Sequence, residues 1–292
     1  MARNGDVEAM IGYLAPESRI NRFFWAADGG RLSTSRTVAH RVTIRNARMA
    51  DPPFTLDRNG FTLVRALTAL AGIHDRAAIE GPYTREMETL ARTLTGADLV
   101  LPMGAEVRSS HPDGGRVQPP AVRAHIDYDG PTARRIALRR YRRARPDGPE
   151  PARAMLLSLW RCVSPPPQDW PLALCDFASC ARDEEVRIVK IDVAHLPEGA
   201  ARFAPIAGED RRGASGLFRF NPAHRWFHYP DMTRDEVIAI KFHDSDHGRA
   251  WRAPHCAFHD ESRPDANPRE SIEFRVAVYF LQNEGCQTGE DR

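Results

Sequence analysis

The short stretch His125-Ile126-Asp127 constrains this chain more than any other feature of its sequence. In a β-strand, residues two apart point to the same face, so His125 and Asp127 can reach one ligand while Ile126 packs behind them. An imidazole and a carboxylate, completed by a second imidazole, form the ligand set of a non-haem Fe(II) centre with open coordination positions. The surrounding run, residues 121–128, is apolar and aromatic enough for a strand. The sequence therefore predicts part of a metal site on a β-strand.

A second histidine, His255, lies in a short apolar run that ends at the turn-rich residues 260–268. The next segment, residues 269–280, alternates polar and apolar side chains and is predicted to be a strand. Four polar side chains share one face of it: Arg269, Ser271, Glu273 and Arg275. An ordinary strand with a solvent-facing side would look the same, but the upstream histidine favours a ligand-binding face. Arginine suits a carboxylate ligand because its planar guanidinium group donates two parallel hydrogen bonds.

Together these residues predict an Fe(II)/2-oxoglutarate-dependent oxygenase. His125, Asp127 and His255 supply two imidazoles and one carboxylate for iron. Arg269 and Ser271 supply a cation and a hydroxyl for the far carboxylate of 2-oxoglutarate, while O2 takes the remaining coordination position.

Further motifs follow one another in a characteristic order: Trp160-Arg161, Pro171-Leu172-Ala173-Leu174-Cys175-Asp176, His224-Arg225-Trp226-Phe227 with Met232, Lys241-Phe242-His243-Asp244-Ser245, Pro254-His255-Cys256-Ala257-Phe258 and Arg269-Glu270-Ser271-Ile272-Glu273. Over residues 60–282 this order resembles the hydroxylase/desaturase family, which includes fungal aspergillic-acid and gibberellin desaturases, an aziridine-forming oxygenase and a cephamycin methoxylation component. The resemblance implies a mainly β fold with flanking helices (α+β) around a double-stranded β-helix, the jelly-roll or cupin-like core.

The resemblance also implies roles for individual residues. It assigns His125, Asp127 and His255 to iron and Arg269 with Ser271 to 2-oxoglutarate. Further candidates are Arg275 and Tyr229 for the cosubstrate and Trp160, Arg161 and Trp226 for the substrate. The implied reaction is hydroxylation, desaturation or cyclisation of a small molecule of specialised metabolism through hydrogen-atom abstraction by a ferryl oxidant. The chain departs from its relatives at Met103-Gly104-Ala105-Glu106, where they tend to carry an aspartate-histidine pair, and at Ser158, where asparagine is common.

Length and composition fit a single oxygenase domain over residues 1–292, with an N-terminal arm (1–60), a jelly-roll core with helices (61–282) and a tail (283–292). No apolar run is long enough to span a bilayer, and the first residues lack the apolar core of a secretion signal. The five cysteines are odd in number and match neither a zinc ribbon nor a Cys-x-x-Cys motif, so we expect reduced thiols. These features predict a cytoplasmic protein without a membrane partner.

One segment is strongly basic although the net charge is only +2. Seven arginines lie within residues 134–145. Because clustered arginines bind the phosphates of nucleic acids, a nucleic-acid groove is one interpretation. Nucleic-acid demethylases of the oxygenase class also share the spacing from Arg269 to Arg275. The other motifs do not belong to a demethylase, and we therefore expect a solvated edge and no nucleic-acid partner. A jelly-roll accessory subunit that works only with a partner is a third alternative, and the sequence leaves a homodimer open.

Local patterns predict the remaining elements. Helical spacing occurs in residues 62–78, with a stripe of Leu63, Leu67, Leu70 and Ile73, and again in residues 84–94. Strands are predicted over residues 99–107, 152–160, 184–191 and 225–229. Residues 233–240 are predicted to be a short helix or turn that leads into the strand around Lys241.

Overall fold

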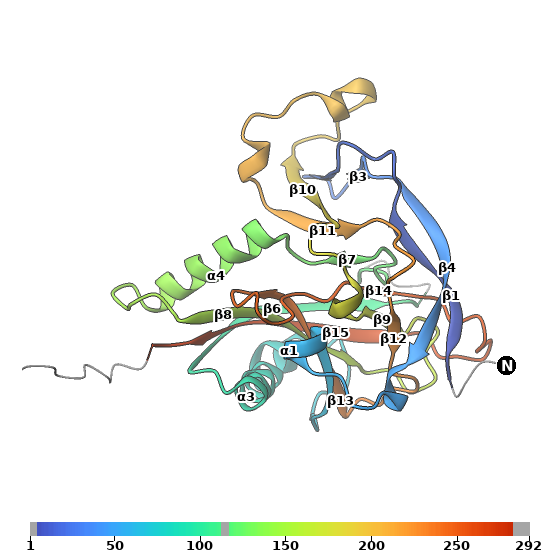
Figure 1. Ribbon diagram of the computed structural model, residues 1–292, viewed down its shortest axis with the longest axis vertical. Helices are drawn as coiled ribbons and strands as arrows, with labels where there is room; N and C mark the ends of the chain where they lie inside the picture. Colours follow the sequence, from blue (N-terminus) through green and yellow to red (C-terminus); the bar gives the residue numbers. More distant parts are fainter. Residues whose placement is uncertain (1–4, 112–116, 283–292) are drawn as a thin grey trace, which may run out of the picture.

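The computed structural model describes residues 5–111 and 117–282, and two β-sheets form its framework (Figure 1). In the described residues the larger sheet has ten strands in the order β1 (Val7–Leu14), β4 (Thr37–Asn46), β12 (Trp226–His228), β9 (Leu172–Cys175), β14 (His255–Ala257), β7 (His125–Ile126), β11 (Ala214–Phe218), β10 (Glu185–Val193), β2 (Arg22–Ala26) and β3 (Arg31–Ser33). The smaller sheet has five, in the order β5 (Phe61–Arg65), β13 (Glu236–Asp244), β8 (Arg153–Cys162), β15 (Glu270–Phe280) and β6 (Leu99–Ser109). One apolar cluster contains residues from both sheets, so the sheets pack face to face. The prediction of a mainly β jelly roll with flanking helices is confirmed.

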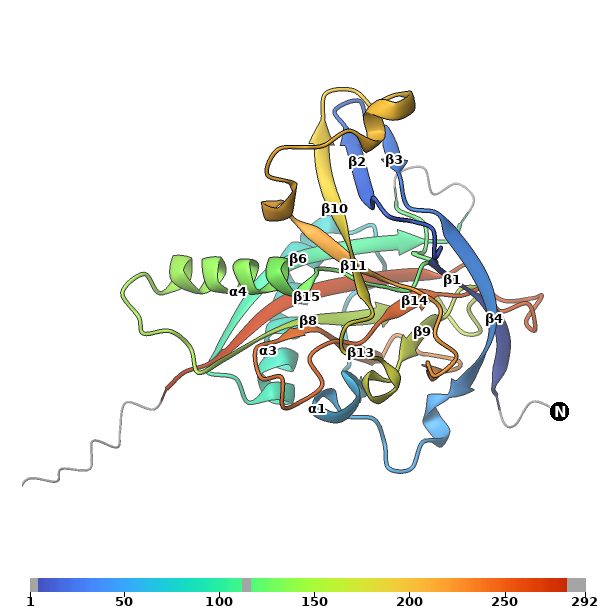
Figure 2. The ribbon, with the colours of Figure 1, turned by 45° about the horizontal axis from the view of Figure 1, so that its top comes forward.

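The longer helices cover opposite faces of the smaller sheet (Figures 1 and 2). Helix α3 (Thr84–Thr95) continues from α2 (Arg76–Ala78) through one wide helical turn, Ile79–Tyr83, and packs Met87 and Ala91 against the outer face. Helix α4 (Gly130–Ala144) begins at Asp129, whose carboxylate accepts a hydrogen bond from the Thr132 amide. Its apolar side packs against the inner face, and its arginine-rich side is exposed. The short helix α1 (Leu56–Asn59) precedes β5.

The inner face of the smaller sheet is divided into an apolar half and a polar half. On β15, Ala277 and Tyr279 lie under α4, and the Tyr279 hydroxyl donates to the Ala137 carbonyl at 2.8 Å. Further along the same strand, Glu273 pairs with Trp160 and Arg275 with Ser158 of β8. Because side chains alternate between faces, these four share the inner face with Ala277. The polar half therefore lies beyond the end of α4 and faces strands β7 and β14 of the other sheet.

The predicted helix over residues 62–78 is wrong. Phe61–Arg65 forms the edge strand β5, which pairs antiparallel with β13, and the chain then runs without regular structure to Asp75. The expected apolar stripe does not share one environment, because Leu70 is buried while Leu67 is 70% exposed. A weak helical periodicity is outweighed here by two factors. The segment pairs with β13, and it contains the β-favouring residues Phe61, Thr62 and Val64.

The prediction for residues 233–240 is also corrected. Strand β13 already begins at Glu236, and Val237 to Ile240 are buried on both faces. Such a run is typical of a central strand. The predicted strands over 99–107, 152–160, 184–191, 225–229 and 269–280 and the helix over 84–94 are confirmed within a few residues at their ends. The strand predicted around His125 shrinks to His125–Ile126. No helix in the described part of the chain has the length and apolar character needed to cross a membrane.

Candidate metal centre

The two histidines predicted to bind metal face each other across neighbouring strands. His125 of β7 pairs directly with His255 of β14, and their ring centroids are 4.6 Å apart. Potential ligand atoms of His125, Asp127 and His255 all lie within 4.8 Å of one another. The structure therefore brings the three residues together from distant parts of the sequence.

Strand β11 holds this arrangement from the other side. It pairs with β7, and a Cβ atom at Gly216 would lie 2.7 Å from Ile126, so only glycine permits the close approach. The Ser215 hydroxyl donates to the backbone carbonyl of Asp127 at 2.7 Å. The backbone of Asp127 is thus fixed just beyond the end of β7.

Hydrogen bonds orient both imidazoles for metal binding. Nδ1 of His125 lies 2.7 Å from the Arg123 carbonyl oxygen, and Nδ1 of His255 lies 3.1 Å from that of Ala253. A carbonyl only accepts, so each Nδ1 carries the proton and each Nε2 keeps its lone pair. This is the usual arrangement of metal-binding histidines, in which the second nitrogen is anchored.

Burial favours the neutral form of both histidines. Desolvation, followed by the proximity of His255, lowers the pKa of His125 to about 3. Desolvation also lowers the pKa of His255. Both imidazoles are therefore neutral at neutral pH, with the proton on Nδ1 and the lone pair on Nε2, which is the form that binds metal.

Asp127 is a buried carboxylate with a cationic partner. Burial opposes its ionisation, but the nearby charge of Arg275 outweighs this effect and holds the pKa of Asp127 well below its usual range. Nε of Arg275 donates to Asp127 Oδ2 at 3.1 Å and to Glu273 Oε1 at 2.6 Å. Burial, followed by the charge of Asp127, raises the pKa of Glu273 to about 7. Arg275, predicted as a cosubstrate residue, thus contacts the metal-site carboxylate.

Arg269 is a buried cation beside the histidines. Its Nη1 donates to the neutral carbonyl of Trp170 at 2.8 Å, its guanidinium lies 5.6 Å from the centre of the Trp160 ring, and its Nε has no hydrogen-bond partner in the described residues. Burial lowers the pKa of Arg269, but only to about 10, so the group remains charged. A buried, incompletely bonded guanidinium is suited to an anionic ligand.

His125, His255, Arg269 and Trp160 line one narrow pocket of about 20 Å³. That volume admits a single ion or water molecule beside the two imidazoles. Within the described residues, Asp127 and Ser271 are not among those that line it. Sequence reasoning missed Arg108 of β6, which also lines this pocket. Arg108 pairs across the sheet with Ser271, and no local pattern could have revealed this register.

The other predicted site residues are placed as follows. Ser271 is buried on β15, two residues from Arg269. Tyr229 packs in the apolar cluster that contains Trp160, where burial raises its pKa and keeps the phenol protonated. Arg161 points to the outer face and donates to the Ala66 and Arg234 carbonyls. Trp226 lies in the main core, where its indole donates to the Tyr13 hydroxyl at 2.7 Å. In the described residues, Arg161 and Trp226 are not among those lining the narrow pocket.

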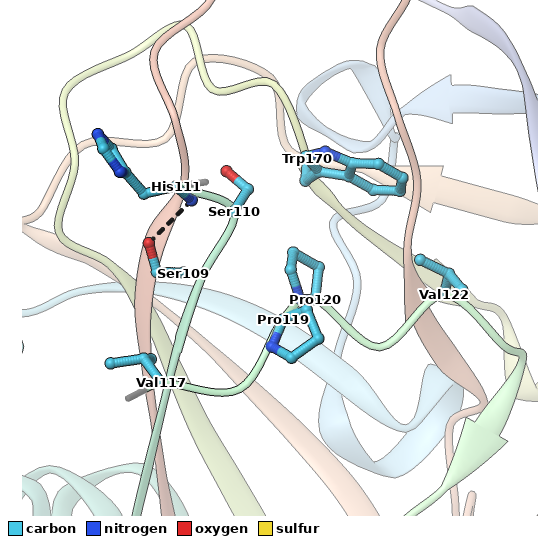
Figure 3. A pocket seen from close by; sticks show the side chains of 8 residues that line it. All are labelled: Ser109, Ser110, His111, Val117, Pro119, Pro120, Val122 and Trp170. Carbon is cyan, nitrogen blue, oxygen red and sulfur yellow. Dashed lines mark hydrogen bonds between the residues drawn. The ribbon is translucent and has the colours of Figure 1, made fainter. Parts of the chain in front are cut away.

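A larger pocket of about 490 Å³ is lined by residues that include Ser110, Pro120 and Trp170 (Figure 3). Two of its lining residues contact Arg269, since the Ser110 hydroxyl accepts from the Arg269 amide at 2.6 Å and the Trp170 carbonyl accepts from its guanidinium. Pro119, Pro120 and Val122 give this pocket an apolar wall. It offers the space for a small molecule that the narrow pocket lacks.

A second group of potential ligands, Cys175, Cys180 and His224, also lies within 4.8 Å. Both nitrogens of His224 already have partners, the Tyr13 hydroxyl at 3.2 Å and the Glu184 carboxylate at 2.9 Å. Cys162, Cys175, Cys180 and Cys256 are free thiols, as expected, while Cys286 lies outside the described residues. The histidine and aspartate cluster is therefore the better metal site.

Known proteins are similar to this chain over most of its length. The family described as "Oxidoreductase/YMDC permease-like domain" matches residues 11–279. The hydroxylase/desaturase efuI of Hormonema carpetanum is 30% identical over 91% of this chain and 95% of the relative. The Fe(II)/2-oxoglutarate-dependent dioxygenase nvfI of Aspergillus novofumigatus is 28% identical over 82% of this chain and 83% of its own.

A solved structure supports the fold. The iron and alpha-ketoglutarate-dependent endoperoxidase NvfI superposes with a TM-score of 0.77 at 24% identity, covering 95% of this chain and 99% of that one. With the extent of the sequence matches and the shared jelly roll, the chain belongs to the hydroxylase/desaturase family of Fe(II)/2-oxoglutarate-dependent dioxygenases.

Proposed function

We propose that this enzyme oxidises a C–H bond of a small molecule of specialised metabolism at an iron bound by Nε2 of His125, Nε2 of His255 and Oδ1 of Asp127. The observation that carries the proposal is the convergence of these three residues within 4.8 Å, with both Nδ1 atoms already engaged by backbone carbonyls. Two imidazoles and one carboxylate on one side of a metal leave the opposite positions open.

Arg269 and Ser271 bind the far carboxylate of 2-oxoglutarate in this proposal. Its support is the buried charge of Arg269, whose guanidinium contacts a neutral carbonyl and keeps Nε without a partner in the described residues. A carboxylate there would satisfy the free N–H and neutralise the charge. Tyr229 packs in the apolar cluster that contains Trp160 and, within the described residues, is not among those lining the narrow pocket.

Trp160 is the best supported of the predicted substrate residues, because its ring lines the narrow pocket next to Arg269. When bound, Fe(II), 2-oxoglutarate and O2 together supply the oxidant that removes a hydrogen atom from an unactivated carbon. The protein positions the cosubstrate with Arg269 and keeps bulk water from the metal with apolar neighbours such as Leu172 and Ile240. Hydroxylation, desaturation and cyclisation are all compatible with these roles.

An anaerobic titration tests the proposal without knowledge of the substrate. Fe(II) followed by 2-oxoglutarate should produce the weak visible charge-transfer band of the chelate. His125→Ala should abolish the band, whereas Arg269→Met should retain metal binding and raise the 2-oxoglutarate concentration needed for half saturation. Arg161→Met, which removes a buried arginine from the outer face of the same sheet, is the matched control. A band of normal intensity in His125→Ala would refute the ligand assignment.

We further propose a single oxygenase domain and a cytoplasmic location. The domain assignment is supported by the pairing of β4 with β12, which joins the N-terminal strands to the large sheet. The location is supported by the four free thiols, since reducing compartments keep cysteines unpaired. Fractionation of the native host cell would test the location.

A further inference from the structure

We propose that Arg275 is a positioning residue that holds the Asp127 carboxylate so that only one of its oxygens faces the metal. The inference rests on the proposed metal site and changes the role that the sequence suggested for Arg275, which was a contact to the cosubstrate.

The two oxygens of Asp127 have different surroundings. Oδ2 accepts the hydrogen bond from Arg275 Nε at 3.1 Å. Oδ1 lies 3.8 Å from Nε2 of His125, the ring nitrogen that the Arg123 carbonyl leaves free. Oδ1 is therefore the oxygen on the side of the His125 ring, and Oδ2 is the oxygen bonded to Arg275 of β15.

A carboxylate needs such a partner to keep this orientation. The Ser215 hydroxyl fixes the Asp127 backbone carbonyl, but rotation about the final side-chain torsion of aspartate is broad. A carboxylate that turned both oxygens toward the metal would occupy an additional coordination position. The proposed reaction needs those positions for 2-oxoglutarate and O2. Because Arg275 occupies Oδ2, only Oδ1 can bind the metal and these coordination positions stay open.

Glu273 in turn holds Arg275. Its Oε1 accepts from the same Nε at 2.6 Å, and its buried side chain reaches the narrow pocket. Arg275 thus lies between two buried carboxylates, and its side chain is 19% exposed. Nε of Arg275 already donates to both carboxylates, whereas Nε of Arg269 has no partner in the described residues. A contact to Asp127 accordingly explains the position of Arg275 better than a contact to the cosubstrate.

The test measures metal and cosubstrate binding separately in Arg275→Met, Arg275→Lys and Arg161→Met. Anaerobic titration gives the Fe(II) affinity, and the charge-transfer band of the Fe(II)-loaded protein gives the 2-oxoglutarate affinity and the band position. We expect Arg275→Met to weaken Fe(II) binding by about 10- to 100-fold, as for other groups that orient metal ligands, and to shift the band. Arg275→Lys should restore part of the affinity through its charge but not the band position. Arg161→Met should leave both unchanged in the folded protein.

The outcomes separate the competing roles. Unchanged Fe(II) affinity with weakened 2-oxoglutarate binding in Arg275→Met would overturn the proposal and return Arg275 to the cosubstrate. Unchanged binding of both would overturn it in favour of a purely structural ion pair. If Arg275→Met does not fold, Arg275→Lys tests the proposal instead. A wild-type charge-transfer band and wild-type Fe(II) affinity in Arg275→Lys would contradict a geometric role for Arg275. Failure of the wild-type protein to bind Fe(II) would instead reject the proposed function.

Discussion

Two clusters of buried charge differ in how completely their groups are bonded. Around Lys241 every donor is used, since its ammonium group contacts Asp57 Oδ1 at 2.8 Å, Asp244 Oδ2 at 2.6 Å and the Ala250 carbonyl at 2.9 Å. Arg153 adds two further hydrogen bonds to Asp244. Each charge in this cluster is neutralised within the protein, as buried charges require.

In the metal-site cluster, by contrast, several donor and acceptor atoms have no hydrogen-bond partner among the described residues. Nε2 of both His125 and His255 keeps its lone pair, and Nε of Arg269 has no partner in the described residues. Native proteins satisfy nearly all buried polar groups, so such exceptions call for an explanation. The difference fits a stabilising role for the Lys241 cluster and the proposed ligand-binding role for the metal-site cluster. The following experiments test this distinction.

The largest expected effect on stability comes from Lys241→Met. It leaves Asp244 buried without its ammonium partner, and removal of one member of a buried ion pair costs about 3–5 kcal/mol. Denaturant unfolding should show this loss in the free energy of unfolding, while Fe(II) affinity in the folded protein stays unchanged. Arg139→Gln on the exposed side of α4 serves as the control. A loss below about 1 kcal/mol would contradict a stabilising role for the cluster.

The next largest effect is stabilisation by metal. A ligand at one hundred times its Kd stabilises the folded state by about 2.7 kcal/mol. Saturating Mn(II), which resists oxidation in air, should therefore raise the melting temperature of the wild-type protein. The increase should vanish in His125→Ala and persist in Lys241→Met. An equal increase in His125→Ala would place the metal elsewhere.

Acid should weaken the Lys241 cluster to a smaller extent. Burial opposes ionisation of Asp57, but Lys241 and Arg153 outweigh it, so its pKa in the folded protein lies well below the usual range. The contribution of Asp57 is therefore complete above the pKa of the unfolded chain, about 3.9, and is lost as the pH falls toward the folded value. The side chain is 44% exposed, and solvent screening keeps this effect modest. Unfolding midpoints followed from pH 6 down to pH 2 should fall more steeply for wild type than for Asp57→Asn, with the difference growing below the unfolded pKa.

The smallest effect concerns charges that belong to neither cluster. Arg134, Arg139 and Arg143 of α4 are exposed to solvent. Replacement of Arg139 and Arg143 by glutamine should change the free energy of unfolding by less than about 0.5 kcal/mol. Because we expect a solvated surface and not a nucleic-acid groove, the wild-type protein should not bind oligonucleotides at low salt. Binding that these substitutions abolish would revive the demethylase alternative.

Local patterns predicted much of the candidate site. The two-residue spacing of His125 and Asp127 and the alternation along residues 269–280 depend only on strand geometry. Arg269 and Glu273 accordingly reach the narrow pocket from the predicted face of β15. The resemblance to a known family supplied the jelly roll, which no local pattern contains.

The rest depended on contacts between distant segments. Arg108 enters the pocket through the register of β6 against β15, which shifts between Arg275 and Val276. The edge strand β5 replaced a predicted helix because β13 pairs with it. Arg275 also needed the three-dimensional arrangement, since only the packing of β15 toward β7 brings it to Asp127.

The direct pairing of His125 with His255 has a consequence for how the chain matures. A slip of one residue between β7 and β14 would turn one imidazole to the opposite side of the sheet, because side chains alternate along a strand. Molecules that formed this wrong register would not assemble the three-ligand site. If iron binds as proposed, only correctly paired molecules would hold it with all three ligands, and metal supplied during refolding should raise the yield of native protein.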